Sequence, residues 1–177
     1  PYIKNYFENR DEVKSWLDKS GIYDNLLSTA LNTNQTAQEQ LDTGSSVVSN
    51  DNLKAGLNQT FTPSYVKQAT EKAIDGAYGW LNGDTSTITF NIDTTTKKAD
   101  FIANLSSTLE PQLATLPRCI SAAQFDPSNP ACLPPGVSAK QAADELATDA
   151  ANQTSIFQQP ISTQTVAQAS DNSQSTT

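Results

Sequence analysis

The 177-residue sequence contains no histidine and no methionine, and it has only two cysteines. Without histidine, neither a Ser-His-Asp triad nor a Cys-His pair can be assembled. A zinc site would have to use carboxylates and the two cysteines alone, which is a poor ligand set for zinc. We therefore expect a protein that is not an enzyme and that holds no metal or cofactor.

Basic residues are few, and long apolar runs are absent. Eleven lysines and arginines stand against nineteen aspartates and glutamates, which gives a formal net charge of -8. The basic residues are scattered, and Lys97-Lys98 is their only adjacent pair. A phosphate backbone or an anionic membrane needs clustered basic side chains, so we expect no nucleic acid as a partner. No run approaches about 18 apolar residues, so no segment is expected to span a membrane.

The two cysteines, Cys119 and Cys132, lie in a short stretch that is rich in proline. A loop this short suits a disulfide. In the loop-closure model, such a bond stabilises the fold by about 3 kcal/mol. Two free, partly buried thiols are the alternative. If the disulfide forms, the compartment of the protein is oxidising.

Apolar residues recur at helical spacing along much of the chain, which predicts a mainly α fold, a small irregular helical bundle. Asn9 and Glu12 suggest a capping box for a helix from about Arg10 to Lys19, which Gly21 ends. Further helices are expected at about 26–31, 51–57, 62–82, 97–116 and 138–150. Pro111 should kink or split the helix at 97–116, because proline removes a backbone hydrogen bond.

The helix at 62–82 carries the clearest start signal, with Thr62 as a cap and Pro63 in the first turn. Its apolar stripe, which includes Val66, Ala73 and Trp80, is expected to face the core.

Residues 87–92 alternate polar and apolar side chains, which predicts a short extended or β segment. The sequence leaves two arrangements open, namely a segment laid across helices or a strand paired with Val47-Val48. From residue 152 the chain is rich in Gln, Ser, Thr and Asn. We therefore expect one helical domain at 1–151 and a polar linker or disordered tail at 152–177, whose removal should leave stability unchanged.

Several short patterns have a catalytic or metal-binding interpretation and a simpler structural one. Residues 64–67 match the S-x-x-K pattern of penicillin-recognising enzymes, but the K-T-G string of those enzymes is absent. Glu71 and Asp75 are four residues apart, and we interpret them as part of a solvated helix face. Asn82 and Asp84 do not match the EF-hand spacing, and turn formation explains both.

Aromatic side chains give the one candidate ligand site, in which Tyr65, Tyr78 and Trp80 form a platform between helices. Aromatic residues on a helix stripe pack in the core more often. The aromatic residues at positions 2, 6 and 7 also have two interpretations. They pack in the core, or they form an interfacial belt if a membrane helix precedes Pro1.

The stretch from Phe61 to Gly136 resembles part of a group of uncharacterised bacterial membrane proteins. The resemblance rests on Thr-Pro at 62–63, Asp-Gly-Ala-Tyr-Gly-Trp-Leu at 75–81, Ile-Thr-Phe-Asn-Ile-Asp at 88–93, Leu-Pro-Arg-Cys at 116–119 and Cys-Leu-Pro-Pro-Gly at 132–136. In those proteins, a domain of this type lies outside the membrane between transmembrane segments. The resemblance implies an extracytoplasmic location, at the cell surface or in a periplasm-like space, and it implies no site residues.

Two functional hypotheses follow. The first is a non-catalytic extracytoplasmic domain of a membrane-anchored bacterial protein, with a role in surface interaction or assembly. Its partners would be the membrane, through flanking segments, and a protein at the cell surface. The alternative is a sensor or solute-binding ectodomain that holds a small ligand between helices near Tyr78 and Trp80.

Overall fold

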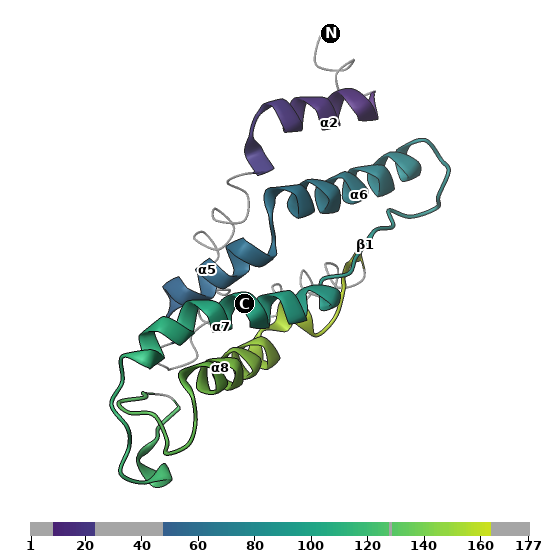
Figure 1. The fold of residues 1–177 in the computed structure, drawn as a ribbon. Helices are drawn as coiled ribbons and strands as arrows, with labels where there is room; N and C mark the ends of the chain where they lie inside the picture. The colour runs from purple at the N-terminus through teal and green to yellow at the C-terminus, as the bar shows by residue number, and fades with distance from the viewer. Residues whose placement is uncertain (1–8, 24–47, 128, 164–177) are drawn as a thin grey trace, which may run out of the picture.

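The computed structural model describes residues 9–23, 48–127 and 129–163, and the described chain is mostly helical, as predicted (Figure 1). The α-helices of this part are α2 (Arg10–Lys19), α5 (Asn50–Thr60), α6 (Pro63–Leu81), α7 (Lys98–Ala114) and α8 (Ala139–Gln153). The shorter elements are β1 (Asn91–Ile92), η1 (Thr95–Lys97), η2 (Ala122–Gln124), η3 (Ser155–Phe157) and β2 (Ile161–Ser162). The helix expected at 26–31 lies outside the described residues.

Local capping chemistry starts three of the helices where the sequence predicts. The side chain of Asn9 accepts a hydrogen bond from the amide of Asp11 at 3.1 Å, and Thr62 caps α6 in the same way. Ser138 and Gln141 form a reciprocal capping box at the start of α8. These bonds satisfy amides that the first turn of a helix leaves without partners.

The bundle core lies where α5, α7 and α8 pack together. One stripe of α7 is fully buried, and it consists of Phe101, Leu105, Leu109 and Leu113. From α5, Leu53 and Leu57 cover this stripe. The facing side of α8 is mostly alanine, with Ala142, Ala143, Ala147, Ala150 and Ala151 buried around Leu146. Small side chains let two helix backbones approach closely, so α8 contributes a thin, tight layer.

Pro111 does not split α7, contrary to the prediction. The helix runs without interruption from Lys98 to Ala114, and Pro111 is exposed on its surface. Leu109 and Leu113, on either side of the proline, are completely buried. Their burial holds the last turn in helical form although the proline removes one hydrogen bond.

The boundary expected at 152 is wrong. Helix α8 continues to Gln153, and the chain then returns to the core through η3. Phe157 of this segment is only 3% exposed, and its ring stacks on Phe61 with the centroids 5.9 Å apart. The ring also lies 4.9 Å from that of Phe101. The domain therefore extends through residue 163.

The predicted extended segment lies against α6, where the main chain of Thr89 meets Gly76, so the arrangement across a helix is found, and it also pairs with a strand that was not considered. Its last residues form β1, which pairs antiparallel with β2 from the C-terminal segment, with Asn91 opposite Ser162 and Ile92 opposite Ile161. The two-residue strands are shorter than the predicted strand at 87–92. The buried hydroxyl of Thr94 donates to the carbonyl of Ile156 at 2.5 Å, which adds a second tie between the same two segments.

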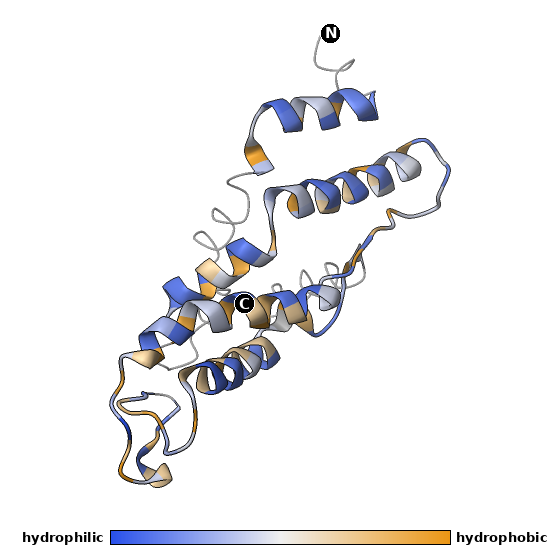
Figure 2. Ribbon diagram, viewed as in Figure 1, coloured by the Kyte–Doolittle hydropathy of each residue, from blue (hydrophilic) through white to orange (hydrophobic). Residues whose placement is uncertain are grey.

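Helix α6 lies beside the core and not inside it, which corrects the expected role of its apolar stripe. None of its residues is fully buried, and Trp80 is 45% exposed. Helix α2 packs antiparallel against α6 (Figure 1), and Lys67 bonds Asp18 across the pair at 2.6 Å. Helix α2 is mostly hydrophilic along its length (Figure 2), so charged groups dominate this contact.

Candidate functional site

The predicted disulfide is present. Cys119 and Cys132 are bonded, with their Cα atoms 5.0 Å apart and a separation of 13 residues. The main chain on both sides of the bond is also paired, because the amide of Cys119 donates to the carbonyl of Leu133 and the amide of Leu133 donates to the carbonyl of Pro117, each at 2.8 Å. The base of the loop is thus closed by one covalent bond and two hydrogen bonds.

Polar side chains order the interior of this loop. Gln124 accepts a hydrogen bond from the amide of Ile120 at 2.8 Å and completes a capping box with Ser121 at the start of η2. Arg118 donates from its guanidinium group to the carbonyl oxygen of Val137. We call residues 117–137 the disulfide loop, and its shape is fixed by these contacts although it contains little regular structure.

An apolar side chain of the disulfide loop, next to the disulfide bond, is exposed to solvent. Ile120 is 91% exposed, the highest exposure of any large hydrophobic residue in the described chain. The neighbouring residues Ala122 and Ala123 are also exposed. Figure 1 shows the loop projecting beyond the ends of α7 and α8. A small, rigid apolar surface therefore stands at one end of the molecule.

A second feature is a polar groove of about 840 Å³ between the start of α2 and the end of α6. Its lining comprises Asn9, Arg10, Asp11, Glu12, Asp75, Tyr78, Gly79, Asn82 and Asp84. Asp75 holds the two helices together here, because its carboxylate lies 2.6 Å from the ammonium of Lys14 and 3.4 Å from the Nε of Arg10. These pairs neutralise the one basic side chain that lines the groove.

The three aromatic residues of the predicted platform do not meet. Tyr65, in the first turn of α6, packs 5.3 Å from Phe61, and its hydroxyl donates to the carbonyl of Asp93. Tyr78 lines the groove some 13 residues further along the same helix, which is about 20 Å away. Trp80 does not line the groove, since side chains two residues apart point to different faces of a helix.

The S-x-x-K motif has no catalytic geometry. Ser64 is exposed at the start of α6, and Lys67 is held by Asp18 of α2. The hydrogen bond that the ammonium of Lys67 donates to Asp18 raises the pKa of Lys67 above its ordinary value. A lysine that acts as a general base needs the opposite shift, so the motif serves the contact between the two helices.

Asp84, considered above as a metal ligand, and Asn52 of α5 both have structural roles. The amides of Asp84 and Thr85 donate to the carbonyl of Gly79, which forms the turn that ends α6. Asn52 and Gln112 exchange two hydrogen bonds between α5 and α7. Within the residues that the structure describes, no group of three acidic or cysteine side chains is arranged to hold a metal ion. No helix of the same part is both long and apolar enough to cross a bilayer.

Two of these features, the exposed Ile120 and the groove, leave no recognisable pattern in the sequence. Ile120 is a single apolar residue between a cysteine and a serine, and no periodicity distinguishes it from a core residue. The groove joins residues that lie more than 60 positions apart. The acidic character of both helix segments was visible, but their antiparallel pairing was not.

Comparisons with known proteins identify no relative of this chain, since no family model, no curated protein and no solved structure matches it.

Proposed function

We propose that this chain is a non-catalytic binding domain that works outside the cytoplasm of a bacterium, anchored to the membrane by segments that flank it. The disulfide supports an oxidising compartment. The observation that carries the binding role is the placement of the disulfide loop. A loop closed by a disulfide, with an exposed isoleucine, lies at the opposite end of the bundle from β1 and the start of α2 (Figure 1).

The chain ends support the anchored arrangement. Asn9, the first described residue, lies beside the end of α6, and β2 is the last strand of the described chain. The disulfide loop is separated from the β1–β2 pair by the length of α7, which is about 25 Å for 17 residues. Segments that hold the chain ends at a membrane would therefore point the disulfide loop away from it.

A pre-ordered loop is suited to protein recognition. Binding orders flexible groups at a cost of about 0.5–1.5 kcal/mol for each immobilised side chain. The disulfide and the bonds of Arg118 and Gln124 have already fixed the loop before any partner arrives. We expect the partner to receive Ile120 in an apolar pocket, within a surface assembly of proteins.

The alternative, a solute-binding ectodomain, is supported by the groove that Tyr78 lines. It is the weaker hypothesis, because Tyr65 and Trp80 do not contribute to the groove and its basic side chain is already paired. A small solute that binds the folded state must raise the melting temperature, so a thermal-shift screen separates the two hypotheses.

The direct test of the binding role is photo-crosslinking in the source cells. A photoreactive residue at Ile120 should give a discrete adduct with another protein, and the Cys119→Ser/Cys132→Ser variant should lose it. Ala99, which is exposed on α7, is the matched control position and should give none. The same adducts from both positions, or none from Ile120, would refute the role of the loop.

A further inference from the structure

The end of α6 carries a second exposed apolar surface, separate from the disulfide loop. We define it as the Trp80 edge, which consists of Trp80 (45% exposed), Leu81 (63%) and Ile88 (39%). Two of these residues form the last turn of α6, and the third lies in the segment that returns from it. None of them belongs to the buried cluster of the bundle.

The path of the chain brings these side chains to one place. After Gly83 the chain turns back along α6, and the main chain of Thr89 lies against Gly76. Trp80 follows Gly76 by one helical turn, so the two share a face of the helix. Ile88 directly precedes Thr89 in the returning segment, so its main chain lies next to this contact with α6.

Both ends of the described fold lie beside this region of α6. On one side, Arg10 at the start of α2 reaches Asp75. On the other, Thr89 lies against Gly76, and Asn91, two residues further on, pairs with Ser162. The first and the last described residues thus lie near this part of α6, whereas the disulfide loop lies at the opposite end (Figure 1).

We propose that the Trp80 edge contacts the interface of a lipid bilayer with zwitterionic headgroups. This inference rests on the proposed anchoring of the chain ends. Tryptophan is enriched at membrane interfaces because its ring is apolar while its N–H remains hydrated.

The charged residues near the Trp80 edge indicate which lipid headgroups it can contact. Anionic lipids attract clustered Lys and Arg. Here, Arg10 and Lys14 are already paired with Asp75, and the nearby Glu12 and Asp84 are exposed carboxylates. An anionic surface would repel them, so apolar insertion into a neutral interface is the interaction that this end supports.

The test uses the full 177-residue chain with a hexahistidine tag at its C-terminus, bound to phosphatidylcholine vesicles that contain a nickel-chelating lipid. The chain has no histidine of its own, so the tag alone forms the tether. It has two tryptophans, so Trp16→Phe leaves Trp80 as the single reporter and Trp80→Phe leaves Trp16. Trp16 is 65% exposed on α2 and serves as the matched control. Vesicles with brominated acyl chains quench a tryptophan that enters the bilayer.

The proposal predicts loss of Trp80 emission on brominated vesicles relative to unbrominated ones, with Trp16 emission retained. Adding Leu81→Ser and Ile88→Ser to the Trp80 reporter should restore emission, provided the melting temperature is unchanged. Replacing part of the phosphatidylcholine by phosphatidylglycerol should not increase quenching. Equal quenching of both reporters, or no quenching of Trp80, overturns the proposal.

The tether supplies the anchoring in this experiment whether or not the natural protein has flanking membrane segments. Absence of quenching would therefore refute the lipid contact and leave the role of the disulfide loop intact. Failure of the crosslinking test at Ile120 would refute the role of the disulfide loop and leave the lipid contact intact.

Discussion

The carbonyl oxygen of Thr89 lies so close to Gly76 of α6 that a Cβ atom on residue 76 would stand 2.2 Å from it. A main-chain oxygen cannot swing aside as a flexible side chain can. Gly76→Ala should therefore push the returning segment off the helix and lower the free energy of unfolding by about 1–3 kcal/mol, as overpacking does elsewhere. Urea denaturation measures this change.

Gly79 is the matched control for Gly76, because it lies in the same helix and its added Cβ would meet only the hydroxyl of Thr85, at an ordinary 3.8 Å. Gly79→Ala should stabilise the helix by up to about 1 kcal/mol. If both variants gain stability alike, the close approach of the segment to α6 is incorrect.

The C-terminal segment should be essential for stability. Phe157 fills the core between Phe61 and Phe101, and a buried phenylalanine replaced by alanine costs about 3–5 kcal/mol. Truncation after Asn152 should cost at least as much, since it also removes β2. Truncation after Thr163 is the control and should leave this core intact. A chain ending at Asn152 that melts like the full chain would contradict the domain boundary.

Removal of the disulfide should destabilise the protein without altering the helices. The Cys119→Ser/Cys132→Ser variant should lose about 3 kcal/mol, as expected for a closed loop of this size. A reducing agent should produce the same loss in the unaltered chain and no loss in the variant. Circular dichroism should show equal helix content in both, because the α5, α7 and α8 core lies outside the loop.

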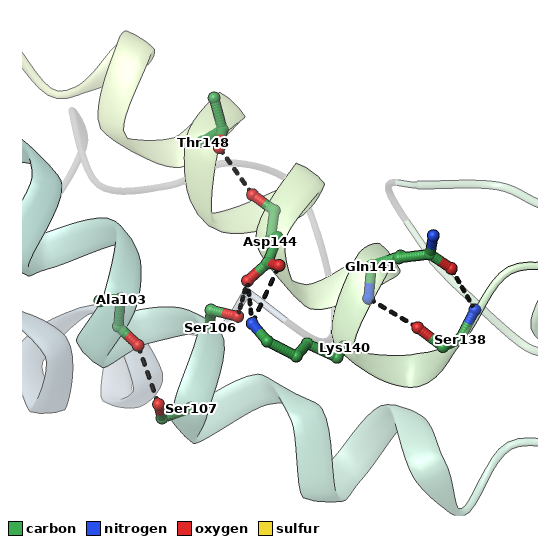
Figure 3. A network of polar contacts seen from close by, with 8 residues as sticks. All are labelled: Ala103, Ser106, Ser107, Ser138, Lys140, Gln141, Asp144 and Thr148. Carbon is green, nitrogen blue, oxygen red and sulfur yellow. Dashed lines mark hydrogen bonds and ion pairs between the residues drawn. The ribbon is translucent and has the colours of Figure 1, made fainter.

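Asp144 should make stability fall in acid. The hydroxyl of Ser106 donates to its carboxylate at 2.5 Å, and Lys140 lies 3.0 Å away (Figure 3). The bond from Ser106, then that from Lys140, lowers the pKa of Asp144 below its ordinary 3.8. A lowered folded pKa means that the charged carboxylate stabilises the fold above about pH 3.8, and that this contribution is lost as the pH falls through the folded value.

The measurement for Asp144 is chemical denaturation at a series of pH values. Asp144→Asn should be less stable than the parent at neutral pH, and its stability should fall less steeply in acid. Glu145→Gln removes a charge from the exposed face of the same helix and is the control. Identical acid profiles for Asp144→Asn and the parent would show that the Ser106 contact contributes nothing.

Features decided by neighbours in the sequence could be predicted. Helix α2 has the predicted bounds because Asn9 caps its first turn and Gly21, with φ of 66°, takes the left-handed position after its end. The start of α6 follows in the same way from Thr62 and Pro63. The disulfide was predictable because its two cysteines lie close together in the chain.

Features decided by distant partners could not be predicted. Phe157 lies in a polar stretch with no helical or strand periodicity, and its burial depends on Phe61, which is 96 residues away. The apolar stripe of α6 has the period of a core helix. However, α7 has larger apolar side chains, and it forms the centre of the buried core in place of α6. The candidate site was missed for the same reason, since neither the exposure of Ile120 nor the approach of the chain ends to α6 leaves a local pattern.

The central claim is that the disulfide loop is oxidised in the natural protein, outside the cytoplasm. Cells that carry the full gene should be quenched in acid, alkylated with a light maleimide, reduced, and alkylated again with a heavy one. Mass spectrometry of the peptides that contain Cys119 and Cys132 then reports the state of each thiol. The account predicts only the heavy label on both residues, and only the light label would contradict it.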